Sequence, residues 1–312
     1  MKTDPQPFLN PDPEYTALEN AAAVILPIPY EGGVSYGKGA AAAPAAVIAA
    51  SHQLEFYDEV LEAEPYRMGI ATVMPPRLPS DPAKVQAVVY RSAKELLDSR
   101  KFVVLIGGDH SVSGPFAQAL KTVHGSLSVI QLDAHADLRD SYDNSRFSHA
   151  CVMARIREIT TNTLQFGIRS MSLEEAQRIE RENIAVCTMS SYRNGAFDID
   201  AALAGLPDPV FLTIDVDAFD WSVIRSTGTP EPGGFTWDEA LHLLKKIFDR
   251  KNVVAFDVVE LSTAPRDLNS PFAVAKLIYK LLGFKLAGAV RDKRLDWPVK
   301  PRGSVFDGGR KH

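Results

Sequence analysis

Eight short apolar stretches, rich in β-branched residues, recur along this chain. Each is nearly continuous rather than alternating, which is the pattern of a strand buried on both faces of a sheet. They span residues 23–29, 68–75, 102–108, 127–133, 164–169, 184–188, 210–217 and 253–260. Helix-like stretches lie between them at 82–99, 115–124, 149–160, 172–182, 237–249 and 271–284. Strands that alternate with helices predict a parallel sheet covered by helices on both sides.

The composition changes this picture little. The chain has 312 residues, of which 46% are apolar and 23% charged, as in an ordinary single α/β domain. Its net charge of −5 gives no indication of nucleic acid or of an anionic membrane as a partner. We find no signal peptide and no apolar run of about 18 residues that would span a membrane. Two cysteines are more typical of reduced thiols than of a disulfide, so we expect a cytoplasmic protein.

Polar residues of metal-binding type follow four of the predicted strands. They form Gly107-Gly108-Asp109-His110, the run DAHAD at 133–137, Asp215-Val216-Asp217, and Glu260. Ligand sites in α/β folds form beyond the carboxyl ends of the strands. Residues two apart on an extended chain point to the same side, so each motif should direct its side chains into one pocket.

The predicted ligand set contains four carboxylates and two imidazoles: His110, Asp133, His135, Asp137, Asp215 and Asp217. Six ligands exceed the four that a tetrahedral zinc takes and suit two cations that share carboxylates. Oxygen-rich ligation without thiolate favours Mn²⁺, with nickel or cobalt as alternatives. A lone aspartate at a strand end is more often a solvated residue or a helix N-cap. Several such motifs at separate strand ends favour the metal centre.

These motifs, in this order, resemble the signature segments of the arginase/agmatinase ureohydrolase family. The resemblance rests on PIPYEGGVSYGKGA (27–40), GGDHS (107–111), DAHAD (133–137), Ser148-His149, TIDVDAFD (213–220), GTPEPGG (228–234) and DVVE (257–260). It implies a three-layer α/β/α sandwich with an eight-stranded, mostly parallel sheet. It also implies one domain with a core at about 24–285, and the Pro- and Gly-rich ends, 1–22 and 300–312, are expected to be loose.

The resemblance further implies roles for individual residues. His110, Asp133, Asp137 and Asp215 match the ligands of one Mn²⁺, and His135 and Asp217 match those of a second, with Asp137 also in the catalytic set. His149 matches a proton-shuttle histidine, and Glu260 matches the acid that holds the guanidinium. A carboxylate offers a planar fork for two guanidinium N–H groups. Ser148 is expected to cap the helix of His149, whose dipole would lower the pKa of the imidazole.

The expected reaction is hydrolysis of agmatine to urea and putrescine, a step of polyamine biosynthesis. The loop at 138–148 carries Asp140 and Asp143, which we expect to bind an amine tail. Its arginines leave guanidinobutyrate and arginine open, and aminopropylagmatine is a longer candidate. A single-metal deacetylase-like enzyme and a non-catalytic metal-binding relative are the competing interpretations. The resemblance also implies a homo-oligomer, a trimer or hexamer.

Overall fold

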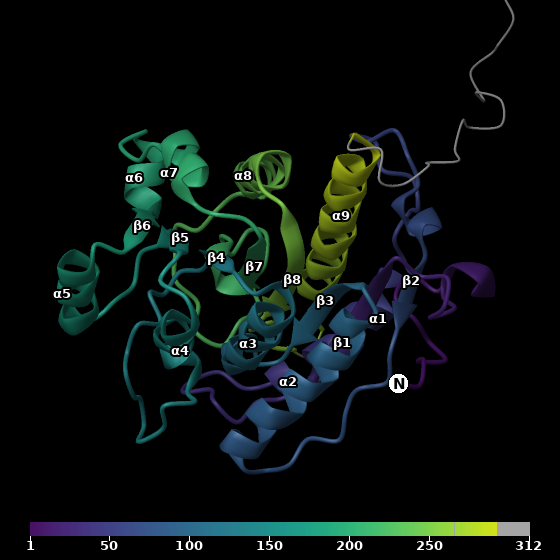
Figure 1. Ribbon diagram of the computed structural model, residues 1–312, viewed down its shortest axis with the longest axis horizontal. Coiled ribbons are helices and arrows are strands. Elements are labelled where there is room, and N and C mark those ends of the chain that lie inside the picture. Colours follow the sequence, from purple (N-terminus) through teal and green to yellow (C-terminus); the bar gives the residue numbers. More distant parts are fainter. Residues whose placement is uncertain (265, 292–312) are drawn as a thin grey trace, which may run out of the picture.

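The computed structural model describes residues 1–264 and 266–291 of the chain (Figure 1). Eight strands form one sheet in the order β2-β1-β3-β8-β7-β4-β5-β6. Every pair of neighbouring strands is parallel, so the predicted eight-stranded sheet is confirmed and contains no antiparallel pair. The strands are β1 (Ala23–Ile28), β2 (Ile70–Thr72), β3 (Phe102–Gly107), β4 (Ser128–Leu132), β5 (Thr163–Ile168), β6 (Ala185–Thr188), β7 (Val210–Asp215) and β8 (Val253–Val259).

Two apolar layers cover the sheet, one on each face. Because side chains alternate along a strand, neighbouring residues such as Val103 and Val104 of β3 belong to different layers. One layer packs against α2 (Pro82–Asp98), α3 (Ser113–His124) and α4 (Val152–Ile159). The other packs against α1 (Ala43–Ser51), α8 (Trp237–Arg250) and α9 (Asn269–Arg291). Figure 1 shows the first group below the sheet and α8 and α9 above it.

The helices agree with the sequence prediction where the amphipathic pattern is strong. The structure has α5 (Leu173–Glu182) as predicted, and the predicted helix at 237–249 is α8, which begins with a capping box between Thr236 and Glu239. The segment predicted as one helix at 149–160 begins instead with a 3-10 turn at His149–Cys151. The prediction missed α1, α6 (Met189–Arg193) and α7 (Ile199–Gly205). These helices are short, and α1 is alanine-rich without a one-sided apolar stripe, so periodicity could not identify them.

The N-terminal segment differs from the loose end expected for 1–22. Phe8 and Leu9 are almost fully buried in the layer that contains α1 and α9. The Phe8 amide donates to Thr72 Oγ1 at 2.9 Å, and the Leu9 amide donates to Ser51 Oγ at 2.7 Å. Burial of an aromatic ring together with satisfied amides fixes this segment, although it is rich in proline. The segment 300–312, also expected to be loose, lies outside the described residues.

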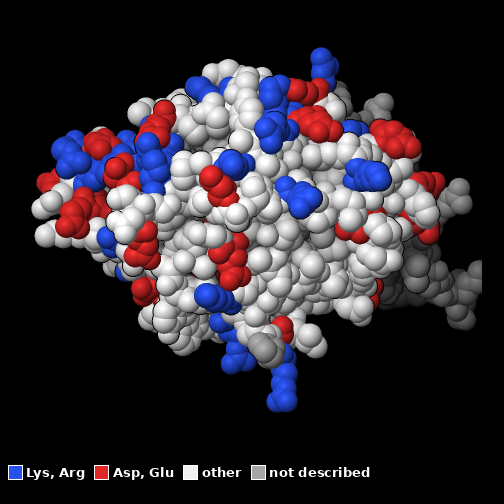
Figure 2. Space-filling model, turned by 90° about the horizontal axis from the view of Figure 1, so that it is seen from below, with Lys and Arg blue, Asp and Glu red and all other residues white. Residues whose placement is uncertain are grey.

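On the face drawn in Figure 2, acidic and basic side chains are interspersed rather than gathered by sign. Within residues 1–264 and 266–291, no helix is both long and apolar enough to cross a membrane.

Gly108 lies where the loops at the carboxyl edge of the sheet pack closely against each other. A Cβ at this position would lie 1.8 Å from the carbonyl oxygen of Tyr30 and 3.1 Å from that of Ala40. We therefore expect Gly108→Ala to lower the free energy of unfolding by about 2–4 kcal/mol, measured by denaturant titration. Gly205→Ala is the control, because nothing lies within 4 Å of its Cβ, and we expect it to change stability by less than about 1 kcal/mol. Equal stabilities of the two variants would contradict this packing.

Candidate metal centre

The predicted ligands meet at the carboxyl ends of neighbouring central strands. His110 follows β3, Asp133 follows β4, and Asp215 ends β7, while Glu260 follows β8. These strands lie in the order β3-β8-β7-β4, so four consecutive strands bring their ends to one place. A parallel sheet collects these residues from distant parts of the sequence because all its carboxyl ends share one edge.

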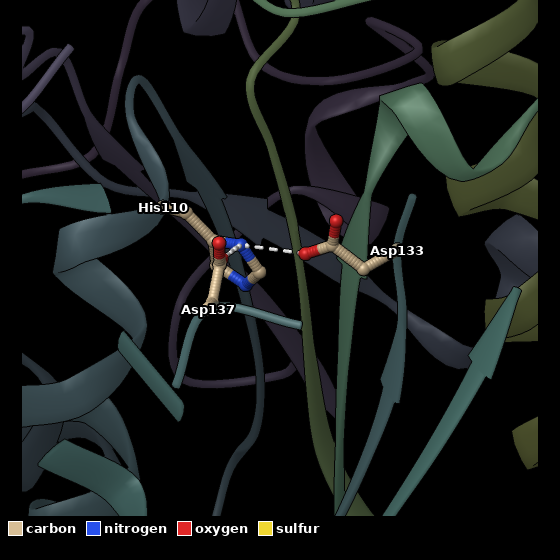
Figure 3. A group of neighbouring side chains, drawn as sticks. All are labelled: His110, Asp133 and Asp137. Atoms are coloured by element: carbon tan, nitrogen blue, oxygen red, sulfur yellow. Dashed lines mark ion pairs between the residues drawn. The ribbon is translucent and has the colours of Figure 1, made fainter. Parts of the chain in front are cut away.

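The first group of ligands surrounds the ring of His110 (Figure 3). His110 Nδ1 lies 3.2 Å from Asp133 Oδ2 and 3.3 Å from Asp137 Oδ2. Asp215 Oδ2, which the figure does not draw, lies 3.4 Å from the same nitrogen. The ring is fully buried, and its Nε2 is engaged with Thr213 Oγ1 at 2.9 Å. Nδ1 has no hydrogen-bond partner in the part of the chain that the structure describes, although three carboxylates surround it. One ring nitrogen cannot donate to three acceptors, so the arrangement indicates ligands of a shared cation.

The second group shares Asp133 with the first. His135 Nδ1 lies 2.9 Å from Asp217 Oδ2 and 3.6 Å from Asp133 Oδ1. Asp133 therefore turns one oxygen toward His110 and the other toward His135. The two sets His110–Asp133–Asp137 and Asp133–His135–Asp217 each have the spacing of a candidate metal site. Of the four aspartates that the sequence left open as bridging ligands, Asp133 is the one common to both sets.

The distances fit divalent cations. Two ligand atoms bound at about 2.1 Å and at right angles on one octahedral ion lie about 3.0 Å apart. The spacings of 2.9–3.6 Å within the two groups are close to this value. Two adjacent groups also argue against the single-metal alternative.

The ligands converge for a different reason from the one predicted. The sequence placed the D-x-H-x-D and D-x-D residues on extended chain, whereas β4 ends at Leu132 and β7 ends at Asp215. The Asp133 carboxylate accepts the His135 amide at 2.6 Å, and the Asp215 carboxylate accepts the Asp217 amide at 2.9 Å. Each first aspartate thus turns the chain at its strand end. Asp137 follows with a positive φ of 53°, so a local turn aims its carboxylate at His110.

Four buried carboxylates in one volume disturb each other's ionisation. Burial and the neighbouring Asp133 raise the pKa of Asp137 to about 6. Burial and the negative charges of Asp217 and Asp133 raise the pKa of Asp215 well above its ordinary value. Burial opposes ionisation of Asp133, yet the adjacent His110 and His135 lower its pKa. These shifts belong to the protein groups alone, and they mark a site whose negative charge is not balanced by its own side chains.

His149 lies at the edge of this centre between two partners. Its Nδ1 is 3.2 Å from Glu260 Oε1, and its Nε2 is 2.9 Å from Ser35 Oγ. Burial alone would lower the pKa of His149, but Glu260 raises it to about 9. The expected lowering by a helix dipole is therefore wrong. Ser148 gives no side-chain cap; its hydroxyl donates to the Gly33 carbonyl at 3.2 Å instead.

Glu260 has one free carboxylate oxygen rather than an open fork. Its Oε1 accepts the His110 amide at 2.7 Å and faces His149. Its Oε2 is buried and has no hydrogen-bond partner within residues 1–264 and 266–291. The backbone at Glu260 has a positive φ of 64°, which is uncommon outside glycine and marks functional sites. A buried, unpartnered carboxylate oxygen is suited to a cationic N–H donor.

The pocket above the centre has a different rim from the one predicted. Its volume is about 160 Å³, and its lining comprises Ser35, His135, Asp137, Arg139, Tyr142, His149, Ala150, Asp215 and Thr229. Asp140 and Asp143, predicted to bind the substrate tail, are not among these residues. Asp140 is exposed and pairs with Arg155 at 2.5 Å. Ser35 and Thr229 were not singled out, although each belongs to a segment that carries the resemblance.

Fold and site together define a metal-dependent hydrolase class, and this chain belongs to the arginase family. The family model matches residues 21–283. An N(1)-aminopropylagmatine ureohydrolase of Synechocystis sp. is 38% identical over 290 residues, 90% of this chain and 94% of that protein. An agmatinase of Pyrococcus horikoshii is 34% identical, over 85% of this chain and 93% of its own. The structure of an agmatine ureohydrolase of Thermoplasma volcanium shares the fold, with a TM-score of 0.80, 24% identity, and coverage of 94% of this chain and 96% of that one.

Asp133 provides the sharpest test of the paired groups. Because it belongs to both, we expect Asp133→Ala to reduce the metal content from about two ions per chain to nearly none. Asp137→Ala should leave about one ion, since the group of Asp133, His135 and Asp217 remains. The number of metal ions per chain is measured by elemental analysis after loading with Mn²⁺ and gel filtration. Glu174→Gln, which changes an exposed carboxylate of α5, should retain both ions. A full complement in Asp133→Ala would rule out the shared ligand.

The ionisation of His149 can be measured directly. In the metal-free protein we expect its imidazole to titrate at about 9 by NMR, and Glu260→Gln should shift this pKa down toward the ordinary value. Because the folded pKa is raised, the ion pair stabilises the fold fully below about pH 6.5 and is lost as the pH rises through about 9. The stability difference between wild type and Glu260→Gln should therefore shrink above pH 9. An unchanged pKa in the variant would contradict the pairing.

Proposed function

We propose that this chain is a binuclear manganese ureohydrolase that cleaves a guanidino compound with a cationic tail into urea and an amine. The observation that carries the proposal is the geometry around Asp133, whose two oxygens face two ligand groups. The buried free oxygen of Glu260 and the imidazole of His149 lie beside these groups.

The proposed cations would be held by His110, Asp133, Asp137 and Asp215 on one side and by His135, Asp217 and the shared Asp133 on the other. Oxygen-rich ligands with imidazole and without thiolate support manganese. When bound, such a pair supplies a hydroxide nucleophile near neutral pH. All of these ligands except His135 are buried, which limits competing ligation by solvent.

Glu260 is proposed to bind the guanidinium through Oε2. Its Oε1 is already engaged by the His110 amide, so the carboxylate is oriented before the substrate arrives. A charge-assisted hydrogen bond from a guanidinium N–H would satisfy the oxygen that is otherwise buried without a partner. The proposed contact is thus through one oxygen, with the second oxygen holding His149 in place.

His149 is proposed to donate the proton that the departing amine needs. With a pKa of about 9, its imidazole is protonated at neutral pH in the protein alone. The Nδ1 of His149 faces the Glu260 carboxylate, which accepts its proton in a hydrogen bond. The Nε2 of His149 faces Ser35, which lines the pocket. A general acid of this kind contributes roughly 10²–10⁴-fold to a rate.

Two substrates with amine tails are supported. Agmatine, predicted from the sequence, gives putrescine, and the Pyrococcus horikoshii relative is named an agmatinase. N(1)-aminopropylagmatine is favoured by the greater identity to the Synechocystis protein. Guanidinobutyrate and arginine remain alternatives because Arg139 lines the pocket. A role in polyamine biosynthesis, a cytoplasmic location and a trimeric or hexameric assembly belong to the same proposal; two buried free cysteines support the location.

The proposal is tested by urea release from the Mn²⁺-loaded protein. We expect release from N(1)-aminopropylagmatine or agmatine at least tenfold faster than from guanidinobutyrate or arginine, measured at equal substrate concentration. Asp133→Ala should abolish the release. Strong release from an anionic-tailed compound would keep the reaction but reject the tail specificity. Two bound metals without urea from any of the four compounds would instead favour the non-catalytic relative.

A further inference from the structure

Arg169 braces the loop at 228–234 against the metal centre. Its Nη2 donates to the carbonyl oxygens of Asp217 at 2.6 Å and of Glu231 at 2.8 Å. Its Nε donates to the Pro232 carbonyl at 3.0 Å. One side chain thus ties the main chain of a predicted metal ligand to the main chain of the loop. A guanidinium fork fixes such a position more rigidly than a single donor does.

The same loop carries Glu231, which lies outside the pocket lining itself but beside His135, one of the lining residues. Proline stands on both sides of this residue, at 230 and 232, and fixes the backbone φ there. Glu231 Oε1 lies 4.0 Å from His135 Nε2, on the side of the ring away from Asp217 and Asp133. In the part of the chain that the structure describes, its side chain makes no hydrogen bond and is 35% exposed. Glu231 therefore combines a braced main chain with a carboxylate that has free hydrogen-bonding capacity.

The other charged groups near the pocket already have partners. Arg139 Nε lies 3.7 Å from Glu175 Oε2, and the guanidinium stacks over the Tyr142 ring at 5.2 Å. Asp140 is paired with Arg155. A cationic group that leaves the pocket on the side of His135 would thus meet, at Glu231, a carboxylate that makes no hydrogen bond with the described residues.

We propose that Glu231 binds the ammonium group of the substrate tail and thereby selects amine-tailed guanidino compounds. The inference rests on the proposed function and deepens it. Thr229 of the same loop lines the pocket, and Glu231 Oε1 lies 4.0 Å from the ring of His135, another lining residue. A tail that leaves the pocket on the side of His135 would bring its ammonium group toward Glu231. Because Arg169 already holds the main chain at Glu231, only the side chain has to be ordered on binding.

The test compares tails of equal length and different charge on the Mn²⁺-loaded enzyme. In Glu231→Gln we expect KM for agmatine to rise about 10-fold or more, the factor of a lost charge-assisted contact, with kcat nearly unchanged. KM for n-butylguanidine, which has the same chain without the ammonium, should not change. Glu174→Gln is the matched control for removing one negative charge elsewhere, and it should leave both KM values as in wild type.

Two outcomes would overturn the assignment. An equal KM for agmatine in wild type and Glu231→Gln would show that the tail binds elsewhere. A fall in kcat on both substrates, or a loss of metal, would show that Glu231 acts through His135 instead.

A binding measurement separates this inference from the proposed reaction. Agmatine should raise the melting temperature of the loaded wild type more than that of Glu231→Gln, whether or not urea is released. Binding that depends on Glu231 without urea release would reject the proposed reaction and keep the tail contact. If urea is released but agmatine raises the melting temperature of both proteins equally, the proposed reaction stands and the tail contact is rejected.

Discussion

Mutual repulsion among four buried aspartates is the constraint on which this structure depends. Asp133, Asp137, Asp215 and Asp217 are each less than 10% exposed and lie around two imidazoles. Two like charges about 4 Å apart repel by about 4 kcal/mol at an effective dielectric constant of 20. Burial and this repulsion raise the pKa of three of the four. A fold that holds them together is stabilised by compensating positive charge, which protons or the proposed cations would supply, and the edge of the parallel sheet keeps the carboxylates in place.

Main-chain amides share in holding the negative charge. Asp133 accepts the amide of His135, Asp215 that of Asp217, and Asp217 that of Ala134. Glu260 accepts the His110 amide in the same way. The first two bonds lie within one strand end each, whereas the last two join the ends of β4 and β7 and of β3 and β8. Each acidic residue therefore fixes the turn after its own strand or after a neighbouring strand. The ligand geometry and the strand endings are therefore one feature, and neither could change alone.

Sequence reasoning identified the strands and the ligand set because both leave local patterns. A doubly buried strand reads as an unbroken apolar run, and D-x-H-x-D and D-x-D stand out after such runs. Contacts that depend on long loops left no such pattern. Ser35 reaches His149 across 114 residues, and Asp140 turns to Arg155 on α4 rather than into the pocket. Loop direction is decided by tertiary partners, so the charge of the 138–148 loop did not predict its role.

The residues proposed to carry the chemistry follow the strands, whereas the residues that would set the specificity lie on loops. The ligands and Glu260 lie on the ends of central strands, where neighbouring strands fix them on both sides. The pocket rim is built from loops at 31–39, 138–148 and 228–234, each anchored to the centre by few bonds. Asp109 Oδ2 accepts the Gly33 amide at 2.6 Å, and Arg169 secures the third loop. Under the proposed function, substitutions in these loops would change the tail that is accepted without moving a predicted metal ligand.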